Sequence, residues 1–315
     1  MTVYTAAKEK RATTALSTAI CILSLAVMLL FNEAIRRGAK KGLDLCLGSL
    51  MPTLFPFFIL SDLWVGCFSV NRHSILSRLY ERLFNISSAT LPAVIMGSVC
   101  GFPLGIRLAA EQYNRGQINK NELGRICGFA NNPSAAFVIS GIGAGLFGDV
   151  KIGILLYISV IFSAVIVALI TRRKSEISRI YEDIPRQRYN IVDSIKSAGA
   201  SSITVSSYII FFSALIELIA TLSKNKLTGA VFAIFLEITG AACSIVSLTE
   251  ISDITKHFFT AFALGFSGLS VHMQAFSFMP PELSRRRYLF TKLLQGLICA
   301  ITMATLSFTI KKAAL

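Results

Sequence analysis

The sequence predicts an all-α polytopic membrane protein with about 8–9 transmembrane helices, some of them broken or re-entrant, in two related halves. Of its 315 residues, 54% are apolar and 15% are charged, and the mean hydropathy is +0.65. Apolar stretches of about 18 to 25 residues, long enough to cross a hydrocarbon core as a helix, recur from end to end. The net charge of +14 comes from basic residues concentrated between these stretches, which is typical of topology signals and of lipid headgroup contacts.

The same features exclude other classes of protein. A soluble fold carries more charge, and the strands of a membrane barrel would alternate apolar and polar residues. The lipid bilayer accounts for the basic charge, so we expect no nucleic-acid partner. The seven cysteines and three histidines are scattered, and no H-E-x-x-H, P-loop or G-x-S-x-G pattern occurs. We therefore expect no enzyme, no bound metal and no cofactor.

Nine apolar segments divide the chain, which we take as a single membrane domain, 1–315. The first resembles a signal peptide but lacks a short cleavage motif, so we expect it to be retained as a helix. The segments lie at about 12–31, 43–69, 89–108, 123–147, 152–170, 199–222, 228–249, 258–279 and 289–310.

Basic residues between the segments predict the orientation. The connection from Thr171 to Asn190 is rich in arginine, so it should be cytoplasmic, with the N-terminus outside if all nine segments cross. In that arrangement the basic strings Arg36 to Lys41 and Arg285 to Arg287 fall on opposite faces. One segment that enters and leaves on the same side is therefore an alternative.

The two halves repeat a series of features in the same order. The first repeat covers about 40–147 and the second about 194–280, each with an aromatic stretch, a glycine-marked segment and a segment of small polar residues. Full crossings would make the repeats parallel. An inverted repeat, common in secondary transporters, requires one re-entrant segment.

Two breaks are expected in the first half. Asn131, Asn132, Pro133 and Ser134 interrupt an apolar segment, and Asn132 followed by Pro133 is a typical helix start, whose free N–H groups attract anions. The alternative is a kink that only packs against neighbours. The second break contains Gly101, Pro103 and Gly105 and is followed by Arg107, which either faces a substrate carboxylate or extends to lipid headgroups.

The second half offers matching candidates. Glu237, with Thr239 beside it, lies deep in an apolar segment and is a candidate for proton coupling, the alternative being an acid held neutral by a hydroxyl neighbour. Ser267, Gly268 and Gln274 form the expected other wall of a substrate site. Phe102 and Phe129 flank the first-half breaks and either stack on an aromatic substrate or pack in the core.

With these motifs, the chain resembles the sporulation integral membrane proteins of the nucleoside-recognition, or Gate-domain, group. The motifs extend over about residues 40 to 280: Leu-x-Pro52-x-Leu-Phe-Pro56, Gly101-Phe-Pro103-x-Gly105, Asn131-Asn132-Pro133-Ser134, Leu-Glu237-x-Thr239-Gly240 and Phe266-Ser267-Gly268-Leu-Ser270 with Gln274.

The resemblance implies a function that the residues alone do not show. The chain resembles the stage V sporulation dipicolinate transporters, which implies export of dipicolinate, a small organic anion, from the mother cell toward the forespore. The residues themselves are consistent with alternating access around a site between the two broken halves. The resemblance also implies a place in the bacterial cell membrane, as the outer forespore membrane during sporulation. The alternatives are a nucleoside or similar metabolite carrier and a non-transporting scaffold for maturation of the spore envelope. A homo-oligomer is compatible with the sequence.

Overall fold

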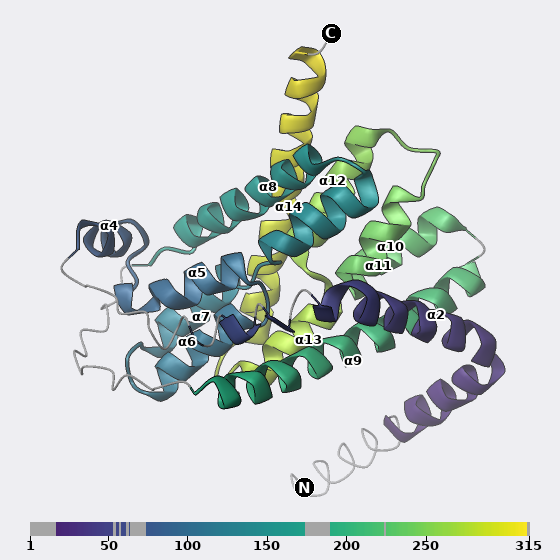
Figure 1. Ribbon diagram of the computed structural model, residues 1–315, viewed down its shortest axis with the longest axis horizontal. Helices are drawn as coiled ribbons and strands as arrows, with labels where there is room; N and C mark the ends of the chain where they lie inside the picture. The colour runs from purple at the N-terminus through teal and green to yellow at the C-terminus, as the bar shows by residue number, and fades with distance from the viewer. Residues whose placement is uncertain are drawn as a thin grey trace, which may run out of the picture.

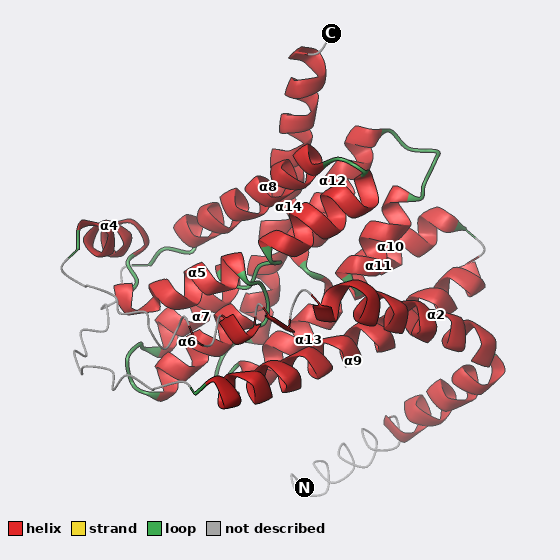
Figure 2. Ribbon diagram, viewed as in Figure 1, coloured by secondary structure: helices red, strands yellow, loops and turns green. Residues whose placement is uncertain are grey.

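The chain folds as an assembly of helices, as predicted. The computed structural model describes residues 17–52, 55–56, 58–60, 63, 74–173, 190–223 and 225–313, and all regular structure within these ranges is helical (Figure 2). In chain order the elements are Ser17–Leu30, α2 (Asn32–Leu45), η1 (Cys46–Leu50), α4 (Ile75–Phe84), η2 (Ser88–Thr90), α5 (Leu91–Val99), α6 (Leu104–Asn114), α7 (Lys120–Phe129), η3 (Phe137–Phe147), α8 (Val150–Ile170), α9 (Ile191–Ser223), α10 (Lys226–Leu236), α11 (Ile238–Val246), α12 (Asp253–Phe266), α13 (Gly268–Phe278) and α14 (Arg285–Ala313).

Within the described part of the chain, three unbroken helices are long and apolar enough to cross a membrane. They are α8, α9 and the stretch Arg285–Lys312 of α14. The 21 residues of α8 extend about 31 Å, which matches a hydrocarbon core of about 30 Å. These helices confirm the segments predicted at 152–170, 199–222 and 289–310.

The N-terminal segment continues past its predicted end. The helix Ser17–Leu30 is followed by a second helix, Asn32–Gly48, at a bend of 87°, and together the two pass as one broken span or a re-entrant loop. The second helix packs on α9 through Gly38 and Gly42, where an added Cβ would lie 2.6 Å from the Ser213 carbonyl oxygen and 2.9 Å from the Ile210 Cα. Such glycine contacts permit close helix packing in lipid. Much of the predicted segment 43–69 lies outside the described residues.

The segment predicted at 89–108 forms a hairpin of two short helices, α5–α6, and not one helix long enough to span a membrane. The Gln112 side-chain amide donates to the Ala89 carbonyl (2.6 Å), so the two helices run antiparallel. The hairpin also starts beside the start of α7, because the Ser87 N–H donates to Glu122 Oε1 (2.8 Å). The 9 residues of α5 and the 11 of α6 each extend only about 14 to 17 Å, roughly half of the hydrocarbon core.

The segment predicted at 228–249 forms a second hairpin, α10–α11. Its two helices lie side by side (Figure 1) and share an apolar cluster that contains Ala230, Ala233 and Ile245. The sequence analysis allowed for one segment that turns back, and the described residues contain two such hairpins. Composition alone does not distinguish one long helix from two short ones that turn back.

The two hairpins enter from opposite ends of α9. Arg107 of α6 donates to Ser197, near the start of α9 (2.9 Å), whereas α10 begins three residues after α9 ends. Because α9 has 33 residues, its ends lie about 50 Å apart. Hairpins that enter from opposite ends are what an inverted repeat would give; the two repeats, at about 40–147 and 194–280, stay a prediction.

The positions of two arginines agree with a hairpin at α10–α11. Arg287, at the start of α14, lies near enough to Arg173 for their charges to interact, so both belong to one face. Nine full membrane spans would place them on opposite faces, whereas with α10–α11 as a hairpin only α9 and the α12–α13 pair span between them. Arg37 and Lys41 instead pair with Glu217 near the end of α9, so the basic string Arg36 to Lys41 lies toward the other end of α9.

Two further predicted segments are broken helices. The segment at 123–147 becomes α7 and η3, separated at residues 130–134, and that at 258–279 becomes α12 and α13, separated at Ser267, whose φ is 80°. The first break was expected from the sequence, and the second lies in the small polar stretch expected to form the other wall of a substrate site.

Each hairpin tip packs against one of these breaks. From here on, a crossing means such a contact between a tip and a break, and not a membrane span. At the first crossing, formed by the α5–α6 tip and the α7–η3 break, a Cβ on Gly97 or Gly105 would lie 2.0 or 2.1 Å from the Ala130 carbonyl oxygen. At the second crossing, formed by the α10–α11 tip and the α12–α13 break, a Cβ on Gly268 would lie 3.2 Å from the backbone of Glu237. Glycine is needed at the first crossing because backbone meets backbone there.

Candidate functional site

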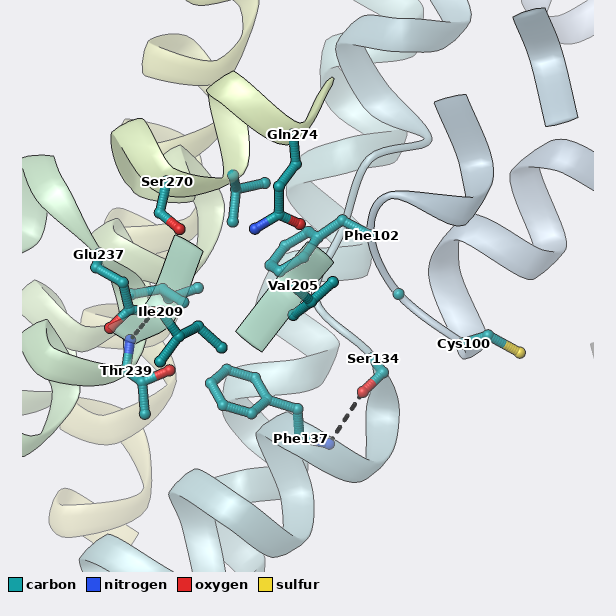
Figure 3. A pocket seen from close by; sticks show the side chains of 13 residues that line it. Cys100, Phe102, Ser134, Phe137, Val205, Ile209, Glu237, Thr239, Ser270 and Gln274 are labelled. Carbon is teal, nitrogen blue, oxygen red and sulfur yellow. Dashed lines mark hydrogen bonds between the residues drawn. The ribbon is translucent and has the colours of Figure 1, made fainter. Parts of the chain in front are cut away.

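A cavity lies between the two crossings, beside the middle of α9. It measures about 40 Å³ when counted as the space open to the centre of a water molecule, which is room for a few waters. Figure 3 shows side chains from both crossings around it. Its lining consists of Cys100, Gly101, Phe102, Ser134, Phe137, Val205, Ile209, Glu237, Ile238, Thr239, Ser270, Val271 and Gln274.

The first crossing contributes mostly backbone and aromatic surface to the cavity. Gly101 has a φ of 89°, and a Cβ added there would lie 2.6 Å from the Ser134 backbone nitrogen. The Ser134 hydroxyl accepts a hydrogen bond from the Phe137 N–H (3.1 Å), so it caps the half-helix η3 and is already partnered. Phe102 and Phe137 present their rings to the cavity (Figure 3).

The second crossing contributes a buried carboxylate. Glu237 is the N-cap of α11: its Oε1 accepts from the Thr239 N–H (2.9 Å) and its Oε2 from the Gly240 N–H (2.7 Å). Its side chain is buried, and no described cationic side chain forms an ion pair with it. The helix N-terminus is thus the positive partner of this carboxylate.

Two polar groups of α13 face the cavity without a partner. Ser270 and Gln274 are 1% and 2% exposed, and neither the Ser270 hydroxyl nor Gln274 Oε1 has a hydrogen-bond partner within the described residues. An unpaired buried polar atom costs about 1–3 kcal/mol. Native proteins keep such groups where a ligand or water completes them.

Five of the predicted site residues line this cavity and six do not. Gly101, Ser134, Glu237, Thr239 and Gln274 line it. Gly268 instead packs at the second crossing, and the Ser267 hydroxyl donates to the Leu264 carbonyl (3.3 Å). Arg107 donates to Ser197. The remaining three are Pro103, which follows the tip, and Asn131 and Asn132.

Asn131 and Asn132 belong to a buried network with α14. The Lys292 ammonium donates to the Asn131 carbonyl (2.8 Å) and to Gln295 Oε1 (2.6 Å), and Gln295 donates to Asn132 Oδ1 (2.7 Å). The Asn131 amide donates to the Tyr288 hydroxyl (3.0 Å), which also meets His272 Nδ1 (3.3 Å). The first break is thus fixed to α14 through its side-chain amides.

Sequence reasoning missed Lys292, Gln295 and Tyr288. Lys292 is fully buried, and no described carboxylate forms an ion pair with it. A signal existed, because a lysine, a glutamine three residues later and a tyrosine four residues earlier share one face of a helix in an apolar segment.

Two further residues, Glu217 and the predicted Phe129, have structural partners. Glu217, the other carboxylate deep in a predicted segment, pairs with Arg37 (3.4 Å) and Lys41 (2.7 Å) across the contact between α2 and α9. Phe129 packs in the apolar core, stacked on Phe84. Among the described residues, no group of three potential metal ligands occurs.

Comparison with known proteins finds a similar membrane protein. The chain is 26% identical to the sporulation integral membrane protein YlbJ of Bacillus subtilis (strain 168) over an alignment of 314 positions. The alignment covers 85% of this chain and 76% of that protein. No family model matches the sequence. No solved structure matches the fold.

Proposed function

We propose that this chain is a secondary transporter that moves a small organic anion through the cavity between the two crossings. The observation that carries the proposal is the cavity itself, where two hairpin tips from opposite faces meet and leave Ser270 and Gln274 unpartnered. Transporters place substrate sites near the midplane between discontinuous helices of inverted repeats. The helix breaks here provide the same combination of backbone groups and buried polar side chains.

The biological setting that we propose is sporulation, with dipicolinate as the cargo. The similarity to a sporulation integral membrane protein supports the setting. The motif resemblance supports dipicolinate, carried from the mother cell toward the forespore, and a place in the outer forespore membrane. Phe102 and Phe137 offer aromatic surface to a flat ring, and Ser270 and Gln274 offer hydrogen bonds to its carboxylates.

The cavity imposes one condition on an anionic cargo. Among the described residues that line it are Glu237 and no arginine, lysine or histidine. Two like charges in a site of low polarity repel each other strongly. We therefore propose that the anion enters when Glu237 holds a proton, which gives Glu237 the role of proton-coupling residue.

A neutral cargo such as a nucleoside is the second candidate. The absence of a basic side chain from the cavity lining favours it, because hydroxyl and amide groups suit sugar hydroxyls and base edges. A nucleoside carrier would use Ser270 and Gln274 without any requirement on the charge of Glu237. Dependence on pH separates the two cargoes.

Uptake into proteoliposomes tests the proposal. Purified protein is reconstituted, and labelled dipicolinate and labelled uridine are offered with and without an imposed proton gradient. Saturable, gradient-dependent uptake of dipicolinate is the expected result, and the double variant Ser270→Ala, Gln274→Leu should reduce it. Uptake of uridine alone would replace the anion with a nucleoside. Absence of both fluxes from correctly inserted protein would reject transport in favour of a scaffold.

A further inference from the structure

We infer that the Glu237 carboxylate occupies the subsite of a substrate carboxylate, and that a proton on Glu237 vacates this subsite for the substrate. The inference rests on the proposed function and adds a mechanism to it. In this mechanism Glu237 and the substrate compete for the same backbone N–H groups, those of Thr239 and Gly240.

The geometry of the Glu237 side chain is that of a bound carboxylate ligand. Each of its two oxygens accepts one N–H from the first turn of α11, at 2.9 and 2.7 Å. Such a pair of N–H groups at a helix start binds any carboxylate, whether tethered or free. Glutamate is an uncommon N-cap, since serine, threonine, aspartate and asparagine are preferred. The longer glutamate side chain can swing away from the helix start, whereas a shorter cap is held close to it.

A second observation points to a ligand beside this carboxylate. The Ser270 hydroxyl and Gln274 Oε1 are buried, unpartnered and directed into the same cavity (Figure 3). The Gln274 amide and the Ser270 hydroxyl can both donate a hydrogen bond to an anion, the glutamine after rotation of its amide. A ligand with two carboxylates could place one on the N–H groups of α11 and the other on α13.

Within the described residues no cationic side chain pairs with Glu237, so its ionisation depends on its own proton and on a bound ligand. Among the described residues, the titratable groups that lie near enough to sense its charge include Cys46, from η1, and Cys243, on α11 itself; both are neutral as thiols. From α9, Ile216 is the neighbour of Gly240, and from α13 the backbone of Gly268 packs against Glu237. Among the described residues, no fixed positive side chain competes with the helix N-terminus for this carboxylate.

Competition of this kind couples one proton to each substrate anion. Ionised Glu237 holds the N–H groups and repels a second anion, whereas protonated Glu237 is a weak competitor. Binding of the anion therefore takes up one proton. The affinity for the anion should rise as pH falls, by about tenfold per pH unit while Glu237 is ionised in the empty protein.

Equilibrium binding, rather than flux, tests the competition. Binding of dipicolinate to the purified full-length protein in nanodiscs is measured by calorimetry across a range of pH. Wild type should show the tenfold dependence. Glu237→Gln should bind at high pH as tightly as wild type at low pH, with no pH dependence, since its amide never carries charge.

Two further variants guard against misfolding and non-specific effects. Glu237→Asp retains a carboxylate that caps α11 well, so the pH dependence should persist with weaker binding at neutral pH. Glu111→Gln alters a carboxylate on α6 that pairs with Arg115 and should behave as wild type.

The outcomes separate the inference from the proposed function. Binding by wild type without pH dependence, or a dependence that survives in Glu237→Gln, would overturn the competition and leave the anion carrier intact. Failure of wild type to bind dipicolinate at every pH would reject the cargo, and the competition with it.

Discussion

The two crossings have similar geometry and different chemistry. At the first crossing, glycines of the α5–α6 hairpin press against backbone of the α7–η3 break. The side-chain amides of Asn131 and Asn132 bond Tyr288 and Gln295 of α14, and the Asn131 carbonyl accepts from Lys292. At the second, Glu237 caps its own half-helix, and the polar side chains of α13 meet the cavity. One crossing is anchored to a neighbouring helix, and the other keeps its polar groups available. Two breaks of related shape can therefore have different roles: the first holds the structure in place, and the second presents polar groups to a ligand.

The largest effect is expected from filling the first crossing. Gly105→Ala would place a Cβ 2.1 Å from the Ala130 carbonyl oxygen, and neither backbone can move without separating the hairpin from the break. Overpacking typically costs about 1–3 kcal/mol, and contact with backbone should exceed that range, so we expect loss of folded protein in fluorescence-detected size exclusion. Gly199→Ala, with nothing within 4 Å, is the matched control. Normal folding of Gly105→Ala would show that the crossing is loosely packed.

Removal of the anchor should have the next largest effect. Lys292→Met leaves the Asn131 carbonyl and Gln295 Oε1 without the ammonium that bonds both. Because an unpaired buried acceptor costs about 1–3 kcal/mol, we expect a clear drop in the thermal unfolding temperature. Lys311→Met, at the exposed end of α14, should leave it unchanged. Unaltered stability of Lys292→Met would mean that the first crossing does not depend on α14.

A moderate effect, on binding and not on folding, is expected at the second crossing. Ser270→Ala removes a hydroxyl that has no partner within the described protein, so stability should stay the same or rise slightly. Affinity for dipicolinate should fall about 3- to 10-fold, the equivalent of one hydrogen bond. Ser277→Ala, about two turns further along α13 and bonded to the Gln274 carbonyl, is the comparison. Equal affinities for the two variants would show that the second crossing is not the binding side.

The smallest effect is expected from the ion pairs between α2 and α9. Glu217→Gln weakens its contacts with Arg37 and Lys41, whose side chains are 50% and 70% exposed. Exposed ion pairs contribute about 0–1 kcal/mol, so both stability and the pH dependence of binding should be near wild type. A loss of pH dependence here would transfer the coupling role away from Glu237.

The helix breaks show which parts of this architecture a sequence reveals. Pro103 and the pair Asn132 and Pro133 predicted breaks because proline removes a backbone donor and asparagine begins helices. The break at Glu237 was missed, since no glycine or proline precedes it and glutamate rarely caps a helix. Its burial and its special chemistry were nevertheless expected from its place in an apolar segment.

The path of the chain through the membrane was harder to predict. Hydropathy reports how many apolar residues follow one another and not whether the chain turns back, so it gave nine segments with one that turns back as an alternative. Of the predicted residues that line the cavity, Ser134 and Glu237 lie at breaks and Gln274 lies about two turns into α13. The roles of Asn131 and Lys292 depend on a contact between residues far apart in the sequence, which no local pattern contains.

The bond between Lys292 and Asn131 also constrains how the protein is made. The two residues are 161 positions apart, so a ribosome that adds about 5–20 residues per second completes the pair roughly 8 to 30 s after Asn131 emerges. During that interval the amides at the first break lack their final partners while the neighbouring helices are already entering the bilayer. The first half therefore completes these contacts only after α14 has been made. A chain that stopped before α14 would leave the polar groups of the first break unpaired and would be a substrate for membrane proteases.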